Sequence, residues 1–222
     1  SKMYLLNTIT GGIVCIICTV IMIISFTNIK DPEAVEVLHQ IAPYFVLIIV
    51  WCVGMAVPSA VAINMEGKNL WQMKTLPISY KQYSLSKILL SYIVLAPFVC
   101  VASIVLFIYT EKNFLNAFIT FVTPQIYLFS MCCIGYFVNL HFYKLKWSNE
   151  TEAVKNSAGT LISMLIDFVY TGFLCLALII PGVFGYFIVG VILSTLVVTA
   201  VGVGFFLIDQ NICTNRITRM EC

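Results

Sequence analysis

The chain has 222 residues, of which 61% are hydrophobic and only 10% are charged, and its mean hydropathy is +1.01. A soluble domain carries about 25% charged residues, so this composition excludes a soluble globular protein. The formal net charge of +2 is small, and by itself it indicates no class of partner.

Six apolar segments follow one another, each close to the roughly 20 residues that a helix needs to cross a bilayer. We predict spans at residues 8–27, 44–63, 88–109, 117–138, 160–180 and 186–208. The strands of a membrane barrel would alternate apolar and polar residues, which these segments do not. The sequence therefore predicts an all-α, polytopic membrane protein with one transmembrane domain over residues 1–222.

Basic residues lie mainly on one side of these predicted spans. Ten of the twelve fall in the first, third, fifth and seventh polar segments: Lys2, Lys68, Lys74, Lys81, Lys87, Lys144, Lys146, Lys155, Arg216 and Arg219. Only Lys30 and Lys112 fall in the second and fourth. Because basic residues beside spans stay on the inner face, we expect both termini and the segment 64–87 to be cytoplasmic.

The inner segment 64–87 predicts a short amphipathic helix between the second and third spans. Leu70, Met73 and Leu76 recur at helical spacing, with Trp71 beside them and polar residues between. This helix is either an interfacial anchor that lies on lipid headgroups or a docking element for a cytoplasmic protein. The pattern alone favours neither interpretation.

Pro77 ends that short helix, because the residue before a proline is disfavoured in the helical region. Ser79 and Gln82 then have the spacing of a capping box, which predicts a new helix that runs into the third span.

A second inner segment, 141–159, predicts another helix start. Asn149 is spaced to cap a helix at Glu152, and Glu150 and Glu152 occupy the first turn, where carboxylates are favourable. We expect this helix to continue as the fifth span. It is either an ordinary helix start or a second contact with a cytoplasmic partner.

Both inner segments resemble permease subunits of bacterial ATP-binding-cassette exporters. The run Glu66-Gly67-Lys68-Asn69-Leu70-Trp71, continued by Lys74-Thr75-Leu76-Pro77-Ile78-Ser79 and by Ser86-Lys87, is similar to that family's "EGKNxWxxKxLPIS" stretch. The run from Trp147 to Lys155 is similar to its "W-x-N-E-x-E-x-V-K" segment. Members of that family are longer, so this chain would correspond to a carboxy-terminal half.

The resemblance implies a coupling helix that inserts into a groove of a separate ATPase subunit. The coupling residues would be Glu66, Gly67, Lys68, Asn69, Leu70, Trp71, Met73, Leu76 and Pro77. A second cytoplasmic contact would comprise Trp147, Asn149, Glu150, Glu152 and Lys155. The resemblance further implies a second six-span half or copy, a bacterial plasma membrane, and a peptide, lipid or hydrophobic compound as cargo.

Catalytic and cofactor motifs are missing from the sequence. Gly67-Lys68 lacks the other residues of a phosphate-binding loop, so ATP and magnesium would be held by the partner ATPase. His39 and His141 fall on opposite predicted faces, which argues against a His-based metal cluster. The sequence also lacks an HExxH motif and paired intramembrane carboxylates, so an enzyme is not expected. Nucleic acid is not an expected partner.

Asp167 is the only acidic residue well inside a predicted span, and such residues are costly in a bilayer. It is either an intramembrane polar site or a neutral side chain bonded to a hydroxyl such as Ser163. So few buried ionisable groups favour an external ATPase as the motor. The rival interpretation is an ATP-independent secondary transporter or lipid scramblase, and an embedded enzyme has little support.

Three prolines, Pro58, Pro97 and Pro124, lie within predicted spans. Each removes a backbone hydrogen bond and is able to bend its helix. They serve either helix packing or a hinge.

Overall fold

The computed structural model describes residues 2–28, 32–56, 58–75, 77–110, 113–154 and 157–220, and the regular structure within these ranges is entirely helical. The α-helices are α1 (Lys2–Thr27), α2 (Pro32–Ile41), α3 (Val46–Met55), α4 (Leu70–Thr75), α5 (Tyr80–Phe107), α6 (Phe114–Ala117), α7 (Thr123–His141), α8 (Glu150–Val154), α9 (Ala158–Val183) and α10 (Phe187–Arg219). Short 3-10 helices are η1 (Ala42–Phe45), η2 (Pro58–Val61) and η3 (Gly67–Asn69), and the π-helical turn η4 is Phe118–Val122.

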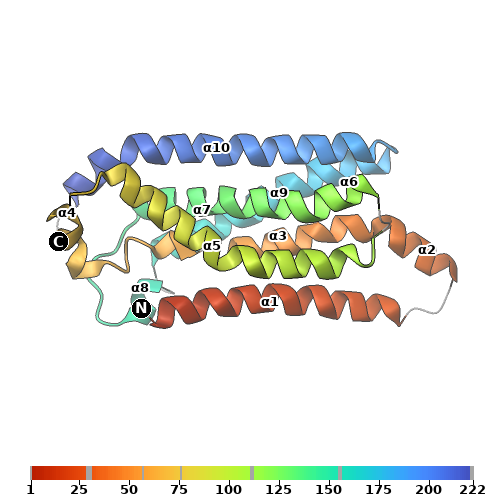
Figure 1. The fold of residues 1–222 in the computed structure, drawn as a ribbon, viewed down its shortest axis with the longest axis horizontal. Helices are drawn as coiled ribbons and strands as arrows, with labels where there is room; N and C mark the ends of the chain where they lie inside the picture. Colours follow the sequence, from red (N-terminus) through yellow and green to blue (C-terminus); the bar gives the residue numbers. More distant parts are fainter. Residues whose placement is uncertain are drawn as a thin grey trace.

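Six helical segments in the described ranges are long and apolar enough to cross a membrane, so the predicted all-α polytopic fold is confirmed. They run side by side along the long axis of the molecule (Figure 1). The start of α1, the end of α10, α4 and α8 gather at one end, which we name the inner end. Helices α2 and α6 lie at the other. Which end faces the cytoplasm stays a prediction.

Helix α7 is the centre of the bundle, and it packs against α3, α5, α9 and α10. It belongs to the least apolar of the six spanning segments and yet is mostly buried, whereas α1 and α10 expose most of their surface. In a bilayer the lipid-facing helices have to be apolar, and a helix with polar side chains is stable only where protein surrounds it. The hydroxyl and amide groups of α7 therefore explain its central place.

The three intramembrane prolines have different effects. Regular α3 stops at Met55, and the chain continues past Pro58 as the 3-10 helix η2 and then as turns. Pro97 lies inside a continuous α5, and Pro124 is the second residue of α7, directly after η4. Backbone that departs from the α-helix at membrane depth is tolerated only where protein buries it, and residues 58–64 are all buried.

The expectation that the helix begun at Glu150 continues as the fifth span is wrong. Helix α8 spans only Glu150–Val154, and Ser157 has extended backbone angles of φ −93° and ψ 142°. The Ser157 hydroxyl accepts a hydrogen bond from the N–H of Thr160, so it caps a separate helix, α9. The inner segment is thus a short helix set apart from the membrane span.

Candidate functional site

The two inner segments, 64–87 and 141–159, meet at the inner end. Gly67 adopts a left-handed backbone with φ +51°, and a Cβ at this position would lie 3.1 Å from ring atoms of Trp147. The Trp147 indole N–H donates to the carbonyl oxygen of Asn64 at 2.8 Å. Residues from both motifs that resemble the permease family therefore form one unit, which we name the inner assembly.

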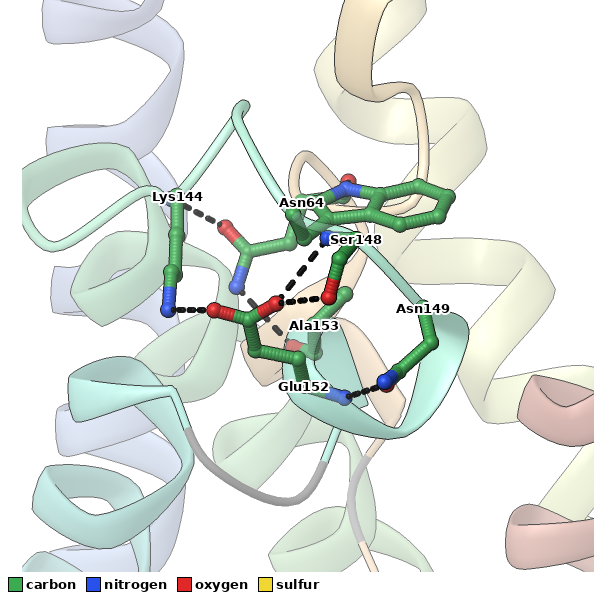
Figure 2. Close-up of polar contacts among 7 residues, drawn as sticks. Asn64, Lys144, Ser148, Asn149, Glu152 and Ala153 are labelled. Atoms are coloured by element: carbon green, nitrogen blue, oxygen red, sulfur yellow. Dashed lines mark hydrogen bonds and ion pairs between the residues drawn. The ribbon is translucent and has the colours of Figure 1, made fainter.

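Asn64 and Asn139 are the buried centre of the inner assembly. The amide nitrogen of Asn139 donates to Oδ1 of Asn64 at 2.9 Å, and its own Oδ1 accepts from the N–H of Ile63 at 2.7 Å. Asn64 Oδ1 also accepts from the N–H of Lys144 at 2.7 Å, and Asn64 Nδ2 donates to the carbonyl of Ala153 at 3.3 Å (Figure 2). One pair of amides thus joins the second span, α7 and α8.

Glu152 organises the second segment. Its carboxylate contacts the Lys144 ammonium at 2.6 Å and accepts from the N–H and hydroxyl of Ser148 at 2.9 and 3.0 Å (Figure 2). The Glu152 N–H donates to Oδ1 of Asn149 at 2.9 Å, so the predicted cap by Asn149 is confirmed. Lys144 and the donors of Ser148 lower the pKa of Glu152, which lies in α8 outside the spanning helices, to about 2.

Glu66 ties the first segment to α5. Its carboxylate forms an ion pair with Lys87 and accepts a hydrogen bond from the Tyr83 hydroxyl at 3.4 Å. The predicted capping box is confirmed, because Ser79 and Gln82 each accept from the other's backbone N–H at 3.2 and 3.1 Å. The first turns of α5 are therefore attached to the inner assembly through Glu66.

Helix α4 forms where a short amphipathic helix is predicted, and it is anchored on one side only. Leu70 is completely buried, whereas the neighbouring Trp71 side chain is 54% exposed. The Lys74 ammonium donates to the carbonyl oxygen of Met220 at 2.6 Å, which links α4 to the end of α10. An exposed tryptophan thus stands on a helix that is fixed through Leu70 and Lys74.

The remaining predicted coupling and contact residues divide into two groups. Asn69, Pro77 and Asn149 are exposed, and Glu150 is partly buried in the first turn of α8. The side chains of Lys68 and Met73, and the residues Leu76 and Lys155, lie outside the described part of the chain.

Asp167 lies in the core between α9, α7 and α3, away from the inner assembly. The Tyr127 hydroxyl donates to Asp167 Oδ1 at 2.8 Å and lies 2.8 Å from the Thr171 hydroxyl. A Cβ at Gly54 would lie 1.5 Å from Oδ1, so only glycine leaves room for this carboxyl group. The hydroxyl of Ser163, the alternative partner expected from the sequence, makes no hydrogen bond with any described residue.

The sequence does not predict two features of the interior. The sixth span is predicted to end at Ile208, but α10 continues without a break to Arg219, and it buries Asp209 completely. Asp167 is therefore not the only buried carboxyl group in the spanning helices. The second feature is Asn139, which the sequence marks only as an amide near the end of a span that also contains Gln125.

A groove of about 670 Å³ opens at the end opposite the inner end. Apolar side chains from η1, α9 and α10 line most of it, and Asn113 and Asn116 stand where α6 begins. Tyr44 and Phe187 form part of the wall, with ring centroids 5.3 Å apart. Its size and lining suit an apolar or amphipathic small molecule.

Fold and sequence pattern together define a multi-pass α-helical membrane protein. The chain belongs to the family described as "Membrane protein of 12 TMs", whose model matches residues 12–208. The spanning segments described above number six, half of the twelve in that description. Comparisons with curated proteins and with solved structures gave no match.

Proposed function

We propose that this protein is the transmembrane permease subunit of an ATP-binding-cassette exporter in a bacterial plasma membrane. The observation that carries the proposal is the inner assembly: two segments that each resemble the permease family contact each other through Asn64, Gly67 and Trp147. The contact is evidence separate from the resemblance, because two segments about 80 residues apart in the sequence do not meet through nearness along the chain.

Helix α4 would be the element that an ATPase subunit contacts. A docking helix has to be fixed to the spans that it moves, and Leu70, Lys74 and the Glu66–Lys87 ion pair supply that attachment. It also needs an exposed anchor, and large aromatic residues supply most of the binding energy of interfaces. Trp71 has this position.

The proposed transporter is completed by a second six-span half or copy. Support comes from the family, which is described with twelve spans. The apolar lining of the groove near Tyr44 favours a hydrophobic or amphipathic cargo, within the class of peptides, lipids and hydrophobic compounds. ATP and magnesium would bind to the ATPase.

A photo-crosslinking residue in place of Trp71 tests the docking. The matched control is the same replacement at Trp51, which is 40% exposed and lies on a spanning helix, with its ring packed on Phe168. We expect position 71, but not position 51, to crosslink to a polypeptide with ATP-binding-cassette motifs. Trp71→Ala should also lower cargo-stimulated ATP hydrolysis in the purified complex, while Trp51→Ala should not.

The second candidate is an ATP-independent secondary transporter or lipid scramblase. Two buried carboxyl groups, Asp167 and Asp209, favour it, because ionisable residues in spans often mark ion-coupled transport. Crosslinks from position 71 to lipid alone, together with cargo movement in liposomes without nucleotide, would select this candidate and discard the ATPase.

A further inference from the structure

Asp209 lies among buried polar groups of three helices. Its side chain is completely buried, and neither carboxyl oxygen has a hydrogen-bond partner among the described residues. The hydroxyls of Tyr136 on α7 and Ser84 on α5 are also buried, and they lie close enough to interact with each other. Three helices thus bring buried polar groups to one region, which we name the Asp209 pocket.

The charges around the pocket are few. Asp209 is within electrostatic range of Cys133 and Tyr136 on α7 and of Cys213 on its own helix. From α5, Lys81 faces Cys213.

The titratable groups of α9 are engaged elsewhere. Asp167 and Tyr170 are bonded to Tyr127 and Ser130 of α7, and the Tyr170 hydroxyl reaches only the carbonyl of Val198 on α10. The Asp209 carboxyl group therefore has no described cation beside it.

An ionised carboxylate in this position would be strongly unfavourable. Removing a charge from water costs several kcal/mol unless a counter-charge or donors replace the solvent. Asp167 differs, since its Oδ1 accepts from Tyr127. The arrangement at Asp209 suits a neutral carboxylic acid, which carries its own proton.

A metal ion suits the pocket less well than a proton. Calcium takes six to eight oxygen ligands and magnesium six, whereas Asp209 supplies the one carboxyl group among the described residues of the pocket. Among the described residues, no group of three or more His, Cys, Asp and Glu side chains is able to hold a metal.

The pocket lies close to the inner end. Ser84 is four residues after the first residue of α5, which corresponds to about 6 Å along the axis. Its neighbour Tyr83 donates to Glu66 of the inner assembly. Packing changes around Ser84 would therefore reach the base of α4.

We propose that Asp209 is a proton-binding site in exchange with the solution at the inner end, and that its occupancy sets how α10 packs against α5 and α7. Loss of the proton leaves a carboxylate, and the Tyr136 hydroxyl, which lies beside Ser84, then rotates to donate to it. The proton passes to the inner solution, and no other bond changes. The site does not depend on whether an ATPase drives transport.

Infrared difference spectroscopy of the purified protein in lipid nanodiscs, between acidic and alkaline buffer, tests the proposal. The carbonyl band of a protonated carboxylic acid should disappear in alkaline buffer. That loss should be missing in Asp209→Asn and retained in Asp167→Asn. A wild-type band that does not change with pH, or an unchanged loss in Asp209→Asn, overturns the proposal, as does the same loss produced by sodium at constant acidic pH.

A second variant covers the case in which Asp209→Asn does not fold. Tyr136→Phe removes a donor that would stabilise the carboxylate, so loss of the band should move to higher pH. Tyr143→Phe is the matched control, because Tyr143 is exposed and should leave the titration unchanged. Identical titrations in Tyr136→Phe and wild type would show that the band belongs to a group outside the pocket.

Discussion

The side chains of Asn64 and Asn139 are hydrogen-bonded to each other at 2.9 Å in the buried centre of the inner end, and neither exposes any surface. The pair completes the backbone hydrogen bonding at the place where the second span is no longer a regular helix, because Asn139 Oδ1 accepts from the N–H of Ile63.

Asn139→Ala should destabilise the protein more than any exposed amide substitution. It leaves the N–H of Ile63 unpaired in a buried place, and each such group costs about 1–3 kcal/mol. Thermal unfolding in detergent measures the loss. Asn215→Ala, at an exposed position of α10, is the control and should change the unfolding temperature little. Equal effects of the two changes would contradict the role given to Asn139.

Gly67→Ala should loosen the inner assembly. A left-handed backbone costs an alanine roughly 1–2 kcal/mol, and its Cβ would press on the Trp147 ring at 3.1 Å. Thermal unfolding and tryptophan fluorescence should both change. Gly204→Ala in α10 is the control, since a Cβ there meets nothing within 4 Å and alanine is the better helix former. A neutral Gly67→Ala would show that the contact with Trp147 is not tight.

Gly54→Ala should displace Asp167, because the new methyl group would occupy the place of Oδ1. Overpacking of this kind costs about 1–3 kcal/mol. A double-mutant cycle measures it: in an Asp167→Ala background, Gly54→Ala should be nearly harmless. Costs that simply add would mean that the two positions do not share this space.

Ser157→Ala should weaken the start of α9 by about 1 kcal/mol, because Ser157 accepts from the N–H of Thr160. Ser157→Asp, which keeps a capping acceptor, should retain most of the stability in the same thermal unfolding assay. A loss in Ser157→Asp as large as that in Ser157→Ala would argue that the hydroxyl acts through its contact with the Thr160 side chain instead.

The predicted cytoplasmic side of the inner end is tested by single cysteines on a cysteine-free background. In intact cells an impermeant thiol reagent should label Glu33→Cys and leave Gln72→Cys unlabelled, because basic residues retain the segment 64–87 inside. Permeabilised cells should label both positions. The reverse labelling pattern in intact cells would show that the membrane orientation is opposite to the predicted one.

Local patterns in the sequence predict the parts of this fold that depend on neighbouring residues. Apolar length predicts the six spans, and the spacing of Ser79 with Gln82 and of Asn149 with Glu152 predicts two helix starts. The contact of Asn64 with Asn139 joins residues 75 apart, so no local pattern contains it.

The extent of α10 is another feature that hydropathy does not predict. Polar residues follow Ile208, and hydropathy ends a span there, whereas the backbone remains helical to Arg219. Packing of α10 on its neighbours covers one face of this extension, which buries Asp209, Cys213 and Ile217. Burial of Asp209 is a result of that tertiary packing. The sequence alone therefore does not predict that Asp209 is a buried polar residue of the protein interior.

The interrupted second span has a consequence for biogenesis. The backbone around Ile63 completes its hydrogen bonding only with Asn139, which is made 76 residues later, in the fourth span. When the second span leaves the translocon, its inner end therefore has no partner for this N–H group in the chain made so far. That end of the nascent chain has to stay beside water or an insertase until α7 is made. Insertion of the fourth span is therefore the step that fixes the packing of the earlier spans.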